Sequence, residues 1–157
     1  MSDQPPAELL RRLRPVPTYR DQPATSPRDV VGVEPGGAPR TIAVLGNAEP
    51  VLLLFLSAVC TGCRDLWEGI GEVRAGLPDR VRLAVVTPGP GSEDAGAIAA
   101  LAPPGTDTVM SAQAFADYGV AGPPFLVVVD AEKVRTEGVA WGIVETLRAA
   151  RGALEAQ

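Results

Sequence analysis

The sequence predicts an α/β domain in which helices cover both faces of a mixed β-sheet. Apolar runs of strand length alternate along the chain with segments of helical periodicity, which is the pattern of such domains. One run, Val51–Leu56, has no polar position, as expected for a central strand that is covered on both faces. The length of 157 residues suits a single domain with a substantial core.

Residues 1–40 are predicted to form a Pro-rich leader or strap. Nine of the 16 prolines lie within residues 1–50. Within the leader, Ala7–Arg14 can form a short amphipathic helix with three leucines on one face. We consider two interpretations of this segment. It is part of a strap, which packs on the main domain or is partly disordered, or it is a docking helix for a partner. Val30–Val33 is expected to be a short extended piece within a loop from Pro27 to Pro39.

Residues 41–157 are predicted to form the main domain, with strands where β-branched and aliphatic residues run together. These strands are expected at Thr41–Leu45, Val51–Leu56, Arg80–Thr87, Thr106–Met110, Phe125–Val129 and Val134–Val139. Apolar residues at helical spacing predict the helices. They are expected at Arg64–Ala75, from a Ser92 cap to about Ala102, and at Ser111–Tyr118 and Ile143–Ala156.

The composition excludes most classes of enzyme site, because the chain has no histidine and only two cysteines. Without histidine there is no Ser-His-Asp triad, no Cys-His protease and no His-ligated metal site. Two thiolates alone cannot close a tetrahedral zinc site, so we expect no metal. The net charge of -5 argues against nucleic acid as a partner. Thiol chemistry is what remains.

The sequence shows no targeting or membrane-spanning segment. No apolar run approaches the roughly 20 residues that span a bilayer, and the first residues lack the pattern of a signal peptide. The sequence as given is therefore predicted to be cytoplasmic. If it has lost an upstream anchor, the prediction becomes an extracytoplasmic or membrane-tethered protein.

The two cysteines, Cys60 and Cys63, form a C-x-x-C pair where a buried strand is predicted to lead into a helix. A thiolate at the start of a helix is stabilised by the free backbone N–H groups, which favours Cys60 as a nucleophile. Cys63, one turn later, can attack a mixed disulfide formed by Cys60. Thr61 adds a hydroxyl and Gly62 permits close approach of the backbone. Three other interpretations of the cysteine pair stay open. It can be half of a metal site, a structural disulfide or two unreactive buried thiols.

Two segments resemble the thioredoxin superfamily, and they are nearer to its TlpA- and ResA-like or MauD-like branch than to thioredoxin itself. Val51–Cys63 (VLLLFLSAVCTGC) is similar to the active-site strand and helix start of that family. Tyr118–Asp130 (YGVAGPPFLVVVD) is similar to the segment in which a cis-proline faces the C-x-x-C. Pro124 falls on the cis-proline, and Pro123 precedes it. From the residues alone, this proline pair can equally be a rigid turn.

The resemblance implies a thioredoxin-like fold from about Thr41 to the C-terminus and a thiol:disulfide oxidoreductase activity. Cys60 would attack and Cys63 would resolve, with no cofactor besides their own redox-active disulfide. Thr61 and Gly62, together with the proline pair Pro123 and Pro124, would line the substrate groove. The implied partners are protein disulfides or dithiols and an upstream dithiol reductant or membrane oxidant. We expect a monomer.

The chain also departs from the family pattern. Thioredoxins proper carry a buried acidic residue where this chain has Leu54, and an aromatic residue precedes the first cysteine where this chain has Val59. The proton acceptor of Cys63 is therefore open, with water and the nearby helix acids as candidates (Asp65, Glu68, Glu72). These departures keep a second hypothesis, a non-enzymatic binding or redox-sensing module of the same fold. Trp67 is predicted to be a core residue.

Overall fold

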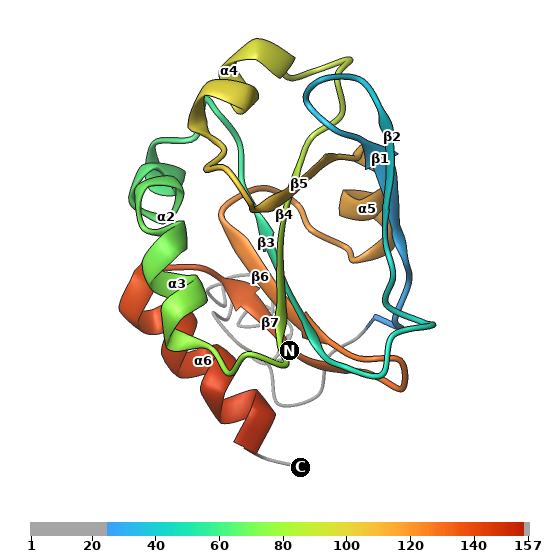
Figure 1. The fold of residues 1–157 in the computed structure, drawn as a ribbon, viewed down its shortest axis with the longest axis vertical. Helices are drawn as coiled ribbons and strands as arrows, with labels where there is room; N and C mark the ends of the chain where they lie inside the picture. The colour runs from blue at the N-terminus through green and yellow to red at the C-terminus, as the bar shows by residue number, and fades with distance from the viewer. Residues whose placement is uncertain (1–24, 156–157) are drawn as a thin grey trace, which may run out of the picture.

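A mixed β-sheet forms the centre of the computed structural model, which describes residues 25–155 (Figure 1). Within these residues seven strands lie in the order β2-β1-β5-β4-β3-β6-β7. β3, β4 and β5 are parallel, whereas β6 and β7 on one side and β1 and β2 on the other run antiparallel to their neighbours. The strands are β1 (Val30–Val33), β2 (Pro39–Ile42), β3 (Val51–Phe55), β4 (Arg82–Thr87), β5 (Asp107–Met110), β6 (Phe125–Val129) and β7 (Val134–Val139).

Helices cover both faces of this sheet, as predicted. The helical elements are a 3-10 turn η1 (Thr61–Cys63) and the helices α2 (Arg64–Glu68), α3 (Ile70–Gly76), α4 (Ala95–Leu101), α5 (Ala112–Asp117) and α6 (Ile143–Glu155). Residues of α2, α3, α4 and α6 pack in one apolar cluster, and residues of α5 pack in a second cluster on the other face. The fold class predicted from the sequence, a mixed sheet between helical layers, is confirmed (Figure 1).

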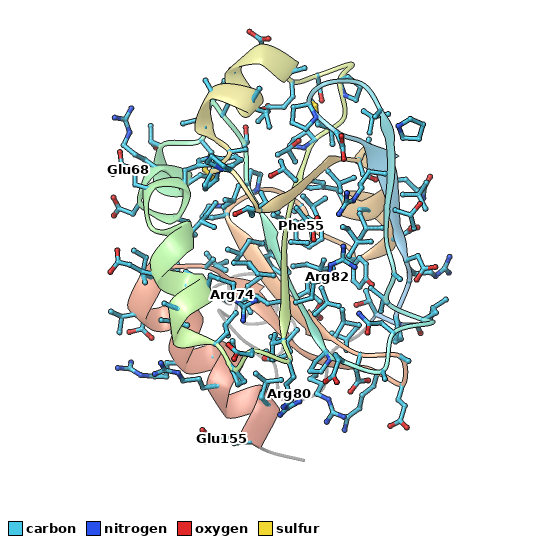
Figure 2. The ribbon with its side chains drawn as sticks, viewed as in Figure 1. Phe55, Glu68, Arg74, Arg80, Arg82 and Glu155 are labelled. Atoms are coloured by element: carbon cyan, nitrogen blue, oxygen red, sulfur yellow. A yellow bond between two sulfur atoms is a disulfide. The ribbon has the colours of Figure 1, made fainter. Side chains whose placement is uncertain are left out.

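β3 is the central strand that its apolar run predicts. It lies between β4 and β6, and all five of its residues are fully buried. Leu52 and Leu54 belong to the cluster on the α2 side, whereas Phe55 belongs to the cluster on the α5 side. The Phe55 ring lies in the interior of the domain (Figure 2), where it meets the ring of Phe115 edge to face at 5.0 Å between centroids. The strand therefore anchors both layers.

The helix predicted at Arg64–Ala75 is interrupted at Gly69. There the backbone leaves helical geometry, with φ -103° and ψ 13°, and α2 ends while α3 begins. The start of α6 approaches this position so closely that a Cβ on Gly69 would lie 2.1 Å from Cδ1 of Ile143. The interruption leaves only η1 and the five residues of α2 directly behind Cys60, in place of one long helix.

The predicted Ser92 cap is wrong, because Asp94 caps α4. Its side chain accepts a hydrogen bond from the backbone N–H of Gly96 at 2.9 Å. Ser92 lies in the preceding turn, where its backbone N–H donates to the carbonyl of Gly89 at 3.0 Å. Glu93 therefore belongs to the loop before the helix.

The β1–β2 hairpin belongs to the central sheet, with β1 pairing with β2 and, at Val33, with Met110 of β5. The second strand runs from Pro39 to Ile42, not to Leu45 as predicted, because the Asp29 carboxylate accepts the backbone N–H groups of Val44 and Leu45. The boundary expected between residues 40 and 41 falls inside β2. The helix predicted at Ala7–Arg14 lies outside the described residues.

Candidate functional site

Cys60 and Cys63 are joined by a disulfide at the end of the central strand, with their Cα atoms 5.3 Å apart. A short loop leads from β3 to Cys60, which precedes η1, and Cys63 ends that turn. Cys63 is fully buried, whereas Cys60 is partly exposed. The geometry makes Cys60 the sulfur that a molecule from solvent can reach.

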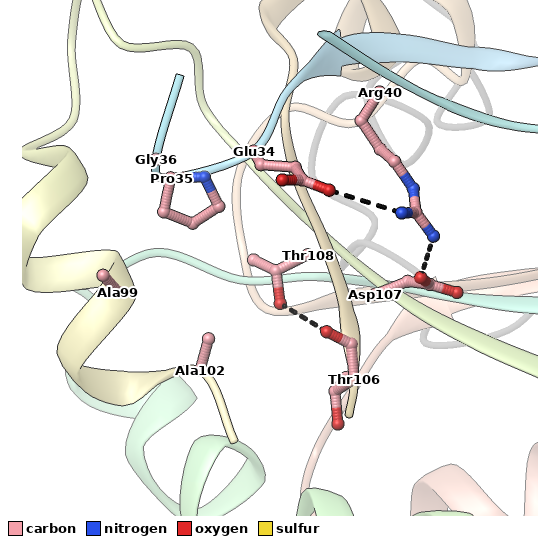
Figure 3. Close-up of a pocket in the computed structure, with 9 residues that line it drawn as sticks. All are labelled: Glu34, Pro35, Gly36, Arg40, Ala99, Ala102, Thr106, Asp107 and Thr108. Atoms are coloured by element: carbon pink, nitrogen blue, oxygen red, sulfur yellow. Dashed lines mark hydrogen bonds and ion pairs between the residues drawn. The ribbon is translucent and has the colours of Figure 1, made fainter. Parts of the chain in front are cut away.

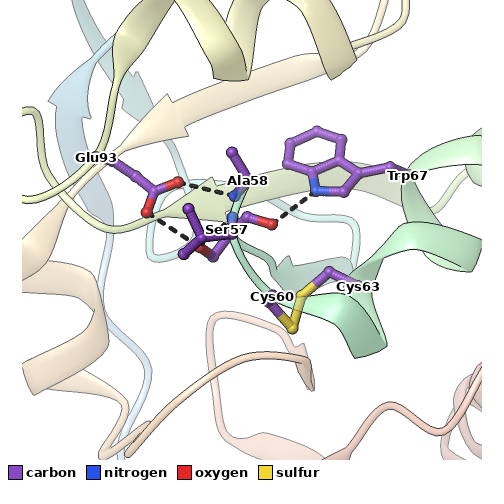
Figure 4. The surroundings of a disulfide bond; sticks show 7 residues. Ser57, Ala58, Cys60, Cys63, Trp67 and Glu93 are labelled. Carbon is purple, nitrogen blue, oxygen red and sulfur yellow. Dashed lines mark hydrogen bonds between the residues drawn. A yellow bond between two sulfur atoms is a disulfide. The ribbon is translucent and has the colours of Figure 1, made fainter.

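The loop that presents Cys60 is held by side chains from two other elements (Figure 4). The backbone N–H of Ala58 donates to Glu93 Oε1 at 2.8 Å, and the Ser57 hydroxyl donates to Glu93 Oε2 at 3.0 Å. From the other side, Trp67 Nε1 donates to the Ser57 carbonyl at 3.1 Å. Trp67 is a core residue, as predicted, and it also provides this hydrogen bond.

The substrate-groove residues predicted from the resemblance lie together around Cys60. A hollow of about 690 Å³ is lined by Cys60, Thr61, Gly62, Pro123 and Pro124. The peptide bond between the two prolines is cis. Pro124 packs against the C-x-x-C turn, because a Cβ on Gly62 would lie 3.6 Å from Cδ of Pro124. The pairing of β3 with β6 brings the prolines and the cysteines together. Phe55 is the last residue of β3, before the loop to Cys60, and its partner Phe125 directly follows Pro124.

A second, smaller hollow of about 250 Å³ also opens beside Cys60, toward α2. Trp67 and Leu101 line it together with the charged side chains of Arg64 and Glu68. Val59, which is 85% exposed, borders both hollows. Cys60 therefore stands between two concave surfaces with an exposed apolar side chain beside it.

Cys63 and Leu54 belong to the same buried apolar cluster. Leu54, which stands where thioredoxins proper carry a buried acid, is fully buried. Asp65, Glu68 and Glu72 are all exposed on α2 and α3, whereas Cys63 is buried. Among the described residues, Glu93 is the carboxylate that lines the same hollow as Cys60 and Pro124.

Glu93 is a site residue that the sequence reasoning missed. β3 and β4 are parallel neighbours, so the residues that follow both strands meet at one edge of the sheet. The pairing of Phe55 with Val86 brings the loop after β4 beside the loop that leads to Cys60. The acidic run after the predicted strand Arg80–Thr87 was the signal that could have identified it.

A further hollow of about 270 Å³ lies between the β1–β2 turn and α4 (Figure 3). Its charged groups neutralise each other. Arg40 pairs with Glu34 at 3.3 Å and also with Asp107, whose carboxylate pairs with Arg82 at 2.9 Å. This network ties the hairpin to β4 and β5, so we assign it a structural role.

Within residues 25–155, no group of three or more His, Cys, Asp or Glu side chains is placed to hold a metal ion. No helix in the same part of the chain is long and apolar enough to cross a membrane.

No protein-family model matches the sequence, and no curated protein matches it. Similar solved structures exist. A secreted Mycobacterium tuberculosis disulfide oxidoreductase, described as homologous to E. coli DsbE, has 19% identity and a TM-score of 0.62, covering 81% of this chain and 95% of that chain. A putative thiol:disulfide interchange protein DsbE from Chlorobium tepidum has 18% identity and a TM-score of 0.66, covering 87% of this chain and 98% of that chain.

A third neighbour is the apo Sco1 protein from Thermus thermophilus, with 16% identity and a TM-score of 0.61, covering 85% of this chain and 93% of that chain. At these identities the likeness shows the fold alone. The strand order, the helices on both faces and these neighbours together show that the chain has a thioredoxin-like fold.

Proposed function

We propose that the protein is a thiol:disulfide oxidoreductase whose Cys60–Cys63 pair exchanges electrons with disulfides or dithiols of other proteins. The observation that carries this proposal is the arrangement of the pair. An accessible Cys60 and a buried Cys63 are joined at the end of β3, directly against Pro124. Neighbours described as disulfide oxidoreductases and thiol:disulfide interchange proteins support it.

In the reducing direction, the Cys60 thiolate attacks one sulfur of a substrate disulfide. That S–S bond breaks, a mixed disulfide forms, and the other substrate sulfur leaves as a thiolate that takes a proton from water. Cys63 then loses its proton and attacks Cys60 Sγ, which releases the second substrate thiol. Two electrons have passed to the substrate, and the protein is left with its intramolecular disulfide. An external dithiol restores the reduced pair by the same two exchanges.

The larger hollow supports an assignment of Thr61, Gly62, Pro123 and Pro124 as the groove for the substrate segment. It is concave and open, and it ends at the accessible sulfur of Cys60. An extended segment can lie along the backbone there with its cysteine facing Cys60. The partners are then a protein with an accessible disulfide and a separate protein that supplies a dithiol.

The test is insulin reduction with two cysteine variants. We expect Cys60→Ser to abolish turnover, because the accessible nucleophile is lost and the remaining thiol, Cys63, is buried. Cys63→Ser should instead accumulate a mixed disulfide with the substrate, visible as a mass increase that dithiothreitol removes. Asp79→Asn, which changes an exposed carboxylate in the turn between α3 and β4, is the control. Wild-type turnover by Cys60→Ser would show that the assignment is wrong.

A second candidate function is a binding or redox-sensing module that keeps the fold without turnover. Leu54 favours it, because this buried residue is apolar at the position where thioredoxins proper carry an acid that takes the proton of the second cysteine. The two functions differ in rate. A pair that exchanges with glutathione but does not accelerate insulin reduction would support the module.

A further inference from the structure

Glu93 is the polar side chain that fixes the loop in front of Cys60. Its two carboxylate oxygens have separate partners, the N–H of Ala58 at 2.8 Å and the hydroxyl of Ser57 at 3.0 Å (Figure 4). The Ser57 oxygen in turn accepts the N–H of Val59 at 3.2 Å. Hydrogen bonds to an ionised carboxylate are stronger than neutral ones. A change at Glu93 is therefore transmitted to the residue next to Cys60.

A hydrogen-bonded turn that begins at Gly89 positions the Glu93 carboxylate. The backbone N–H groups of Ser92 and Glu93 both donate to the carbonyl of Gly89, at 3.0 and 3.1 Å. Asp94 then caps α4 through Gly96. Glu93 thus lies between a closed turn and a helix start, and its side chain faces the loop that carries Cys60.

Few charges surround Cys60. The charged side chains that line the two hollows are Arg64 and Glu68 on the α2 flank and Glu93 on the Pro124 flank. In the larger hollow Glu93 is thus the charged group that shares the space with Cys60. A carboxylate near a thiolate disfavours the thiolate by like-charge repulsion.

We propose that Glu93 is a positioning residue for Cys60, and that its negative charge favours the Cys60–Cys63 disulfide over the dithiol, so that the reduced protein acts as a reductant. This inference rests on the proposed function and adds its direction. A protein with a dithiol/disulfide pair is a strong oxidant when its reduced form is stabilised. Glu93 has the opposite effect, because it destabilises the reduced form by acting on the thiolate.

The test measures the equilibrium between the Cys60–Cys63 pair and glutathione over a series of pH values from neutral to alkaline, with the dithiol fraction read as alkylated mass. The informative variant is Glu93→Gln, which removes the charge and keeps the shape. Its carbonyl oxygen can still accept from Ala58, and its amide can donate to the Ser57 oxygen. The control is Asp94→Asn, which removes the neighbouring charge and keeps an acceptor for Gly96.

At pH values above the alkylation midpoint of Cys60, where the reduced form carries the thiolate, we expect Glu93→Gln to shift this equilibrium toward the dithiol by about threefold to tenfold, where tenfold corresponds to about 30 mV. Below that midpoint the shift should shrink, because the charge of Glu93 acts on the thiolate and not on the neutral thiol. Asp94→Asn should change it by less than about twofold, because Asp94 faces Gly96 and solvent. Glu93→Gln should also move the pH profile of iodoacetamide alkylation of reduced Cys60 to lower pH. Added salt should narrow the difference between the wild type and Glu93→Gln.

The positioning effect is separated by Glu93→Ala, which leaves the Ala58 N–H and the Ser57 hydroxyl without their acceptor. We expect Glu93→Ala to slow insulin reduction by more than Glu93→Gln does, although both remove the same charge. Equal rates in the two variants would overturn the positioning role. Urea unfolding of each variant shows whether a slower rate reflects loss of the folded state.

The outcomes distinguish this inference from the function on which it rests. If the wild-type pair exchanges with glutathione and reduces insulin, but Glu93→Gln shifts the equilibrium no further than Asp94→Asn or shifts it toward the disulfide, the inference on Glu93 is wrong and the function stands. If the wild-type pair does not exchange at all, both are wrong.

Discussion

The two ends of the β3–β6 strand pair are built differently. Where β6 turns into β7, Asp130 accepts the backbone N–H groups of Glu132 and Lys133, each at 2.9 Å, and pairs with Arg135. The side chains of Asp130 and Arg135 are only 14% and 13% exposed. At the other end, polar groups hold the loop before Cys60, but Cys60 and Val59 are left accessible. One end closes a turn, and the other presents a reactive sulfur.

The difference indicates that, along the same two strands, the residues that stabilise the fold and the residues that support the reaction lie at opposite ends. At the far end the hydrogen bonds of Asp130 all stay within the β6–β7 hairpin. At the near end Glu93 and Trp67 reach a loop from elements distant in sequence. Substitutions at the far end should therefore change stability without changing turnover, and substitutions at the near end should change both or turnover alone.

The largest stability effect is expected for Asp130→Asn. The amide oxygen can still accept from the Glu132 and Lys133 N–H groups, but Arg135 loses its charged partner in a mostly buried site. We expect the free energy of unfolding to fall by about 1–3 kcal/mol, measured by urea denaturation, with insulin turnover within about twofold of the wild type. A large loss of turnover with unchanged stability would break the contrast between the two ends.

The pH dependence of the same site has a defined sign. Burial raises the pKa of Asp130, but hydrogen bonds from Lys133, Glu132 and Arg135 outweigh burial and hold the pKa below its usual value of 3.8. Because the folded-state pKa is the lower one, the ionised carboxylate stabilises the fold above the unfolded pKa. This contribution is lost as the pH falls below about 3.8 through the folded pKa.

The measurement for this pH effect is a series of urea unfolding curves between neutral pH and strongly acidic pH. The amide introduced by Asp130→Asn does not titrate, so the difference in unfolding free energy between the wild type and this variant should be constant near neutrality and should shrink in acid. A difference that grows as the pH falls would contradict the lowered pKa. Asp65→Asn, at an exposed carboxylate, should show no such trend.

The contrast also explains what the sequence could predict. Phe125–Val129 and Val134–Val139 are strands with the predicted bounds. For Phe125–Val129 the reason is burial, which imposes a continuous apolar run. At Gly69, where the predicted helix is interrupted, Ile143 of the last helix approaches so closely that a Cβ would not fit, and local periodicity carries no trace of such a contact.

The candidate site divides in the same way. Cys60 and Cys63 were identified from their spacing, and the prolines from a second segment of similar sequence. Glu93 was missed because its partner Ala58 is 35 residues away and because the helix cap was assigned to Ser92. Contacts between two loops at one sheet edge follow from the strand order, which the sequence alone did not provide.

A smaller effect, on both stability and turnover, is expected for Trp67→Phe. The change keeps an aromatic ring but removes the N–H that donates to the buried Ser57 carbonyl at 3.1 Å. We expect a loss of about 1–2 kcal/mol in unfolding free energy and a severalfold slower insulin reduction, because the loop before Cys60 loses one of its two ties. Trp141→Phe, at a tryptophan that is 65% exposed, is the matched control for stability. If both variants behave alike, the indole hydrogen bond does not hold the loop.

The smallest effect is expected at the exposed side chain beside the nucleophile. Val59 is 85% exposed, so Val59→Ser should leave the unfolding free energy within about 0.5 kcal/mol of the wild type. Its apolar surface borders both hollows, where a bound protein substrate would cover it, so its loss should raise the KM for insulin about two- to fivefold while kcat stays unchanged. Exchange with glutathione, which is too small to cover this surface fully, should hardly change. Val31→Ser, at an exposed valine of β1, is the control. A KM that responds equally to both substitutions would place the substrate contact elsewhere than on the rim of Cys60.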